Sequence, residues 1–115
     1  MKSIIIEKPW GKFEQFTHNE SSTVKIIYVN KGGSLSLQTH KHRSEFWKVI
    51  SGSPMITIGG QISEGKAGDE FNIEAQIPHR IEAPNDDVEV LEIATGNFDE
   101  NDIVRLEDKY HRTQI

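Results

Sequence analysis

Four side chains able to bind a metal ion lie within eight positions of one another. They are Gln38, His40, His42 and Glu45, in the segment GGSLSLQTHKHRSEFWKVISG that begins at Gly32 and ends at Gly52. Imidazole nitrogens and amide and carboxylate oxygens are ligands for divalent metal ions. Four such groups in so short a segment predict a metal site.

The same residues would share one face of an extended strand. Alternate side chains of a strand point the same way, so Ser36, Gln38 and His40 would face inward, with His42 continuing the row if the strand reaches it. A buried polar row costs free energy unless its groups are satisfied, and one cation would satisfy an imidazole, an amide and a carboxylate together. The alternative is a solvated hairpin whose polar side chains face water. The hairpin is the simpler explanation for any single His, whereas the whole set favours the metal site.

Length and composition restrict the classes of function. A chain of 115 residues predicts one domain with one core. Its net charge of −5 and the lack of a basic stripe argue against nucleic-acid binding. The absence of cysteine excludes disulfides and thiolate ligands. Because MKSIIIEKPW holds only three consecutive apolar residues, and no later stretch could span a membrane, we expect a cytoplasmic protein without a membrane partner.

Short β-branched segments separated by turn residues predict an all-β fold. The expected strands span residues 4–6, 12–16, 23–29, 46–50, 54–58, 61–65, 70–73, 78–83 and 88–95. The metal-binding segment would break at residues 41–44 and resume as a strand at Glu45. Such spacing with little helical periodicity is typical of an antiparallel sandwich or barrel.

Both ends of the chain also carry predictions. Trp10 is expected to close one end of the core. The tail NFDENDIVRLEDKYHRTQI is expected to form a short helix from about Asp102, because acidic residues favour the first turn of a helix.

Two charged residues alternate with apolar ones on predicted strands. Lys25 shares a face with Ile27 and Val29, so it either contacts a ligand inside the barrel or extends its ammonium group to water. Glu92 shares a face with Val90. A buried Glu92 must be paired or face a ligand, which makes it a candidate base, whereas an edge position would expose it to water.

The spacing of the metal-binding segment resembles the first motif of the cupin superfamily. That motif reads Gly, five residues, His, one residue, His, three or four residues, Glu, six residues, Gly. Taking His40 and His42 as the pair leaves too few residues before Glu45. Taking Gln38 and His40 instead fits every interval across residues 32–52, with Gln in place of the first His.

The second cupin motif is matched in part by GDEFNIEAQIPHRIEA. Gly68 and His79 stand at the expected interval. Glu74, Gln76 and Ala83 replace the Pro, Gly and Asn of the motif.

Four phrases narrow the resemblance: KPWGKFE, LSLQTHKHRSEFW, IPHRIEAP and GNFDENDIVRLEDKYHR. Together they resemble the cupin domain of type II mannose-6-phosphate isomerase, commonly the C-terminal part of a bifunctional enzyme that also contains a mannose-1-phosphate guanylyltransferase. Phe46 and Ala83 stand where that family usually has His and Asn. The resemblance implies a cupin-type double-stranded β-helix, or jelly-roll barrel, with residues 1–115 as a single cupin domain.

The resemblance also implies a function and its metal ligands. The ligands would be Gln38, His40, Glu45 and His79. They would hold one divalent ion, with zinc expected first and Mn, Fe, Co or Ni as alternatives. The implied reaction is the interconversion of mannose 6-phosphate and fructose 6-phosphate.

Other residues receive roles as hypotheses. His42 and Glu92 are candidates for moving the proton. Lys25, Arg43 and Arg80 are candidates for binding the substrate phosphate, and Arg80 is also a candidate catalytic residue. Strand alternation from the preceding His would instead turn Arg80 outward. The expected partners are a sugar phosphate and a second copy of the chain, since jelly rolls leave sheet edges that pairing can cover.

Two other functions fit the same residues. His40, Glu45 and His79 form the two-His, one-carboxylate set used by non-haem Fe(II) dioxygenases. The third alternative is a non-catalytic cupin that binds a sugar phosphate without converting it, since fold alone does not settle function.

Overall fold

The computed structural model describes residues 2–97, 99 and 101–111. In this part of the chain all regular structure is β-strand. The strands are β1 (Ile4–Lys8), β2 (Gly11–Gln15), β3 (Ser22–Val29), β4 (Leu37–Thr39), β5 (Arg43–Ser51), β6 (Met55–Ile58), β7 (Gln61–Glu64), β8 (Glu70–Ile73), β9 (His79–Glu82), β10 (Val88–Gly96) and β11 (Val104–Glu107). No helix of the described residues could cross a membrane.

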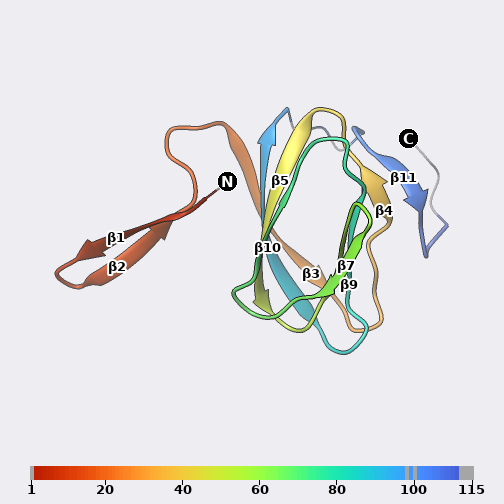
Figure 1. Ribbon diagram of the computed structural model, residues 1–115, viewed down its shortest axis with the longest axis horizontal. Helices are drawn as coiled ribbons and strands as arrows, with labels where there is room; N and C mark the ends of the chain where they lie inside the picture. The colour runs from red at the N-terminus through yellow and green to blue at the C-terminus, as the bar shows by residue number, and fades with distance from the viewer. Residues whose placement is uncertain (1, 98, 100, 112–115) are drawn as a thin grey trace.

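Two antiparallel sheets face each other and form a barrel (Figure 1). The four-stranded sheet has the order β3-β10-β5-β8, and the five-stranded sheet has the order β11-β4-β9-β6-β7. Neighbours in each sheet are mostly distant in sequence, as in a jelly roll, and β1 and β2 form a separate hairpin. The all-β prediction is confirmed.

The barrel interior changes character along its length. The inward row of β5 runs from Val49 through Trp47 to Glu45, and that of β10 runs from Val90 to Glu92, all of them buried. Because β5 and β10 pair antiparallel, the apolar residues of both strands lie at one end and the polar residues at the other. The apolar end packs against the facing sheet and forms the core, which leaves the polar end for a site.

The predicted C-terminal helix is wrong. Residues 104–107 form β11, which pairs antiparallel with β4. The free edge of β4 offers backbone partners to this segment, and its alternation suits a strand. The Asp102 carboxylate accepts the backbone N–H groups of Lys41 and His42 at 2.9 Å each, instead of opening a helix.

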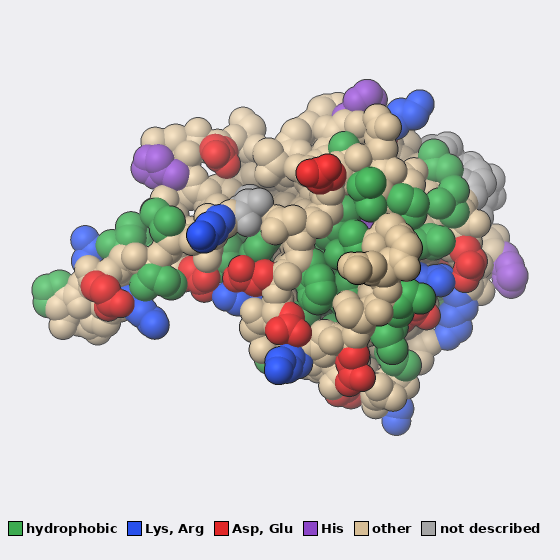
Figure 2. Space-filling view, in the orientation of Figure 1, with side chains coloured by type: hydrophobic (Ala, Val, Ile, Leu, Met, Phe, Trp, Pro, Cys, Tyr) green, Lys and Arg blue, Asp and Glu red, His purple; other side chains and the backbone are tan. Residues whose placement is uncertain are grey.

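The prediction that Trp10 closes the core is also wrong. Trp10 lies in the turn between β1 and β2 and is 74% exposed, while Trp47 fills the core. Residues 2–15, the N-terminal arm, project away from the barrel (Figures 1 and 2).

Candidate metal centre

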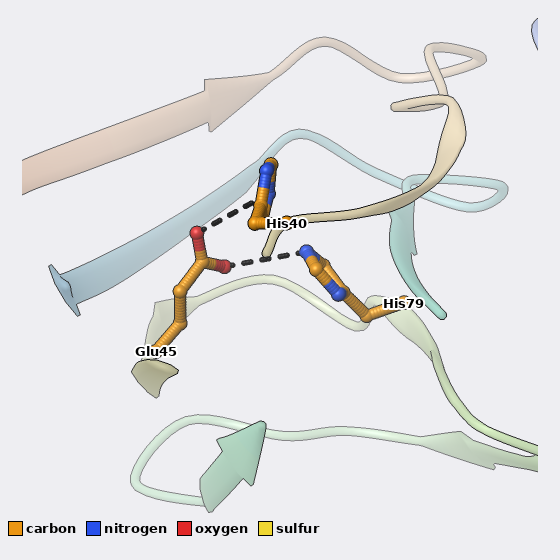
Figure 3. Close-up of side chains that lie close together, drawn as sticks. All are labelled: His40, Glu45 and His79. Atoms are coloured by element: carbon orange, nitrogen blue, oxygen red, sulfur yellow. Dashed lines mark ion pairs between the residues drawn. The ribbon is translucent and has the colours of Figure 1, made fainter. Parts of the chain in front are cut away.

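Three strand segments bring two imidazoles and a carboxylate together inside the polar end (Figure 3). His40 follows β4, Glu45 lies on β5 and His79 opens β9. Nε2 of His40 is 3.5 Å from Oε2 of Glu45, and Nε2 of His79 is 3.4 Å from Oε1. One ligand atom from each residue lies within 4.8 Å of the others, and all three residues are buried. This spacing suits a shared metal ion.

Backbone carbonyls fix the orientation of both imidazoles. Nδ1 of His40 donates to the carbonyl of Asp102 at 2.7 Å, and Nδ1 of His79 donates to the carbonyl of Ile77 at 2.8 Å. A carbonyl can only accept, so the proton lies on Nδ1 and the lone pair on Nε2. Both lone pairs therefore face the carboxylate of Glu45, as metal-binding histidines require.

Burial keeps both imidazoles neutral. Desolvation lowers the pKa of His79 from 6.5 to about 4 and also lowers the pKa of His40. A neutral imidazole is the form that binds a metal ion. Both histidines can therefore bind one at neutral pH without first losing a proton.

Two atoms of the cluster lack hydrogen bonds within the described chain. They are Oε1 of Glu45 and Nε2 of His79, both fully buried. Leaving a buried polar group unsatisfied costs about 1–3 kcal/mol. A divalent ion would satisfy both atoms at once, so the donor set fits such an ion.

Gln38 lies at the edge of the cluster. Its Nε2 is 3.4 Å from Nε2 of His40, and its Oε1 accepts a hydrogen bond from Oγ of Ser36 at 2.7 Å. A half-turn of the amide would face the oxygen toward the cluster, and the Ser36 hydroxyl could then accept from the amide nitrogen. Gln38 can therefore act as a fourth ligand after this rotation.

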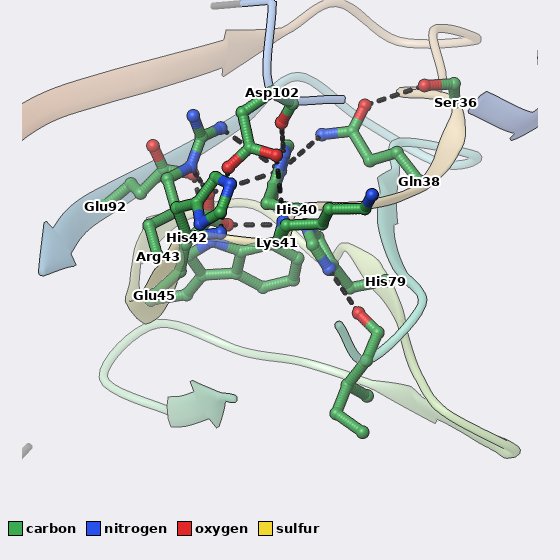
Figure 4. Close-up of polar contacts among 12 residues, drawn as sticks. Ser36, Gln38, His40, Lys41, His42, Arg43, Glu45, His79, Glu92 and Asp102 are labelled. Atoms are coloured by element: carbon green, nitrogen blue, oxygen red, sulfur yellow. Dashed lines mark hydrogen bonds and ion pairs between the residues drawn. The ribbon is translucent and has the colours of Figure 1, made fainter. Parts of the chain in front are cut away.

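The guanidinium of Arg43 lies against the same ligand atoms (Figure 4). Its Nε is 3.1 Å from Oε2 of Glu45, and its Nη2 is 3.1 Å from Nε2 of His40. Arg43 is buried and provides a positive charge beside the cluster. A metal ion that uses these two ligand atoms must displace the guanidinium.

Glu92 lies next to the cluster with its own partners. It accepts a hydrogen bond from Nε1 of Trp47 at 3.2 Å and pairs with Nζ of Lys25 at 3.3 Å. It is only 4% exposed, so the water-exposed alternative is wrong, and Lys25 does turn toward the interior. Burial, and then the charge of Glu45, raise the pKa of Glu92, which suits it to hold a proton.

Two predicted site residues do not join the cluster. Arg80 points to the opposite face of β9 from His79, where it pairs with Glu107 at 2.9 Å and Glu82 at 3.4 Å. Strand alternation is the reason. His42 is exposed in the loop that precedes β5, which begins two residues earlier than expected.

Asp102 is a supporting residue that the sequence patterns did not identify. Its carbonyl orients His40, and its carboxylate holds the loop of residues 41–42. The backbone N–H groups of Lys41 and His42 lower the pKa of the Asp102 carboxyl group. About sixty residues separate the partners, so no local signal revealed the contact.

A match to a protein family covers most of the chain. The family described as mannose-6-phosphate isomerase C-terminal matches residues 2–108. The chain belongs to this family. The resemblance drawn from the sequence is therefore confirmed.

Two curated relatives match the chain over nearly its whole length. Mannose-1-phosphate guanylyltransferase ManC of Salmonella typhimurium (strain LT2) is 34% identical over 109 residues, which are 93% of this chain and 23% of that protein. Xanthan biosynthesis protein XanB of Xanthomonas campestris pv. campestris (strain B100) is 36% identical over 110 residues, 94% of this chain and 24% of that protein. The chain thus spans about a quarter of these relatives.

Solved structures confirm the fold. A double-stranded β-helix protein from Klebsiella pneumoniae aligns with a TM-score of 0.67 at 21% identity, over 80% of each chain. A cupin 2 conserved barrel protein from Rhodopseudomonas palustris aligns with a TM-score of 0.65 at 23% identity, over 74% of this chain and 59% of the other. The fold is the cupin-type double-stranded β-helix.

Proposed function

We propose that the chain is a metal-dependent isomerase that interconverts mannose 6-phosphate and fructose 6-phosphate. The observation that carries the proposal is the buried cluster of His40, Glu45 and His79, whose two Nε2 lone pairs face one carboxylate. Membership of the isomerase C-terminal family supports the choice of reaction.

The cluster would hold one divalent ion, with Gln38 as a fourth ligand after rotation of its amide. Zinc is the first expectation, and Mn, Fe, Co and Ni suit the same donor atoms. When bound, such an ion supplies Lewis-acid stabilisation of negative charge on the substrate oxygens.

Glu92 is the proposed base. Isomerisation of the aldose moves one proton from C2 to C1 and a second from O2 to O1, so the reaction needs no oxidant or reductant. Glu92 accepts the carbon-bound proton and returns it to the neighbouring carbon, because its raised pKa favours a carboxyl group that can carry a proton. Trp47 and Lys25 hold its carboxylate in place.

Arg43 and Lys25 are the proposed cations for the substrate phosphate. Once Arg43 leaves the ligand atoms of the cluster, its planar guanidinium can form paired hydrogen bonds with phosphate oxygens. Lys25 is partly exposed and can reach both Glu92 and a ligand at the mouth of the barrel. Arg80 has no part in this scheme, because Glu82 and Glu107 hold it on the outer face.

A coupled assay for conversion of mannose 6-phosphate to fructose 6-phosphate tests the proposal. The chain is stripped with chelator and reloaded separately with Zn, Mn, Co, Fe or Ni. We expect turnover to return with at least one ion. Binding of the hexose phosphate without conversion under every condition would favour the binding-only cupin and reject the isomerase.

A second function has one specific observation in its favour. The two imidazoles and one carboxylate are the donor set of non-haem Fe(II) oxygenases. Oxygen uptake by the iron-loaded chain with a small enol or phenol, together with no isomerase activity with any ion, would favour that function.

A further inference from the structure

Arg105 lies on β11, an edge strand of the five-stranded sheet. It pairs with Gln38 of β4, and Gln38 in turn pairs with His79 of β9. Residues that pair directly across antiparallel strands have their side chains on the same face of the sheet. Arg105 therefore belongs to the same inward row as two candidate metal ligands, Gln38 and His79.

An irregularity in β11 decides which way Arg105 faces. The register of β11 against β4 shifts between Arg105 and Glu107, so that Glu107 pairs with Leu37. Residues two apart share a face in a regular strand, whereas the extra residue of a bulge reverses the alternation. Glu107 consequently reaches Arg80 on the outer face at 2.9 Å, while Arg105 turns to the inner face.

The burial of β11 agrees with this orientation. The neighbours of Arg105 along the strand, Val104 and Leu106, are 41% and 55% exposed. Arg105 itself is half-buried, and its Nε atom is shielded from water. The strand thus turns one cation toward the barrel and leaves its apolar side chains outside.

Each of the two sheets has an inward row that starts with a cation. In the four-stranded sheet Lys25 lies on the edge strand β3 and pairs with Glu92, which pairs with Trp47. In the five-stranded sheet Arg105 occupies the corresponding place on the edge strand β11. The second row therefore supplies a cation that the proposed reaction does not yet use.

The position of Arg105 suits the far end of a sugar phosphate. Neighbouring strands are about 4.8 Å apart, so two strand spacings place the backbone of Arg105 roughly 10 Å from that of His79. The reacting carbons of the substrate would lie at the ligand atoms of the metal cluster, and the phosphate is bound to the other end of the sugar. A guanidinium can form paired hydrogen bonds with phosphate oxygens.

We propose that Arg105 is a further substrate-binding residue, which binds the phosphate group from the inner face of the five-stranded sheet. This role rests on the proposed function for the identity of the ligand, whereas binding of a phosphate anion by Arg105 can be tested without turnover. The role makes Arg105 a determinant of specificity for phosphorylated over unphosphorylated sugars.

Steady-state kinetics of the metal-loaded Arg105→Met chain test this role. KM for mannose 6-phosphate should rise by about 10–100-fold, as expected for the loss of hydrogen bonds between charged groups. kcat should change little, because the contact is the same in the ground state and the transition state. Arg105→Lys, which retains the charge without the planar fork, should recover part of the loss.

The matched control is Arg80→Met, which removes the same charge from the outer face of the neighbouring strand β9. Its KM should equal that of the unsubstituted chain. Circular dichroism verifies that each variant is folded.

Inorganic phosphate provides the test that needs no turnover. Phosphorus NMR spectroscopy of the chelator-treated chains should show binding by the unsubstituted chain and by Arg80→Met, and its loss in Arg105→Met. This pattern in a chain without turnover would reject the isomerase and still support Arg105 as a phosphate-binding residue. Phosphate binding that Arg105→Met retains, or a KM that it leaves unchanged, would overturn the role of Arg105 in an active isomerase.

Discussion

Strands β5 and β10 run through two different environments inside one barrel. At the apolar end Val49 and Val90 are buried hydrophobic residues, whereas at the polar end Glu45 and Glu92 are almost as deeply buried beside the histidines. The same alternation of inward side chains produces both ends. The apolar end gains free energy from burial, and the polar end retains unsatisfied groups that cost stability. The apolar ends of β5 and β10 therefore stabilise the fold, and the polar ends of the same two strands carry the groups suited to chemistry.

The largest effect on chemistry is expected from Glu92→Gln at the polar end. The amide keeps the shape of the side chain but cannot carry the proton, so turnover should fall by about 10²–10⁴-fold while metal content stays constant. The measurement is the coupled isomerase assay together with metal analysis. Glu89→Gln, on the outward face of β10, is the matched control. Equal activity of both variants would remove Glu92 from the mechanism.

Ile81→Ala should lower the stability of the fold and leave the metal site intact, because Ile81 is fully buried in the core. Loss of its side chain should lower the free energy of unfolding by about 2–5 kcal/mol, as expected for cavity formation. Urea unfolding measures the loss. The folded variant should still bind one metal ion per chain, and a loss of metal from the folded fraction would show that the two ends are not separate.

The acid sensitivity of the metal-free chain should come partly from His79. The pKa of His79 is about 4 in the folded chain and has its ordinary value of 6.5 in the unfolded chain. Between pH 4 and pH 6.5 the unfolded chain therefore binds more protons than the folded chain. The stability that depends on neutral His79 is complete above pH 6.5 and is lost as the pH falls toward 4. The loss is about 3 kcal/mol, and the lowered pKa of His40 acts in the same direction.

Urea unfolding of chelator-treated protein at several pH values measures this dependence. Acidic residues add to the slope, so the comparison is with His79→Gln, which should show a shallower dependence between pH 4 and 6.5. Identical slopes for the two chains would contradict the assignment to His79.

A smaller effect is expected for Arg43→Met. The guanidinium contacts the same atoms of His40 and Glu45 that a metal ion would use, so its removal should raise metal affinity. Removal of one nearby positive charge should raise that affinity by about tenfold. Competition with a coloured chelator measures the change, and Arg43→Lys, which retains the charge, is the control. Unchanged affinity in the Met variant would show that Arg43 does not compete with the ion.

Local patterns predicted the barrel and the inward position of its polar residues. Period-two alternation is enough to place Gln38 with His40, and Glu92 with Val90, on inward faces, and motif spacing identified Glu45 and His79 as further ligands. The β11 strand was missed because it depends on the free edge of β4, which is distant in sequence. Asp102 and Trp10 were misjudged for a related reason: a long-range contact decides the role of the first, and the arm on which the second lies projects away from the core.

The most direct test of the polar end is calorimetric titration of the chelator-treated chain with Zn²⁺. The titration is run beside His79→Ala, with His18→Ala as the control because His18 is exposed. The account predicts one ion per chain for the unsubstituted protein and for His18→Ala, and none for His79→Ala. An unsubstituted chain that binds no ion, or a His79→Ala chain that binds a full equivalent, would contradict it.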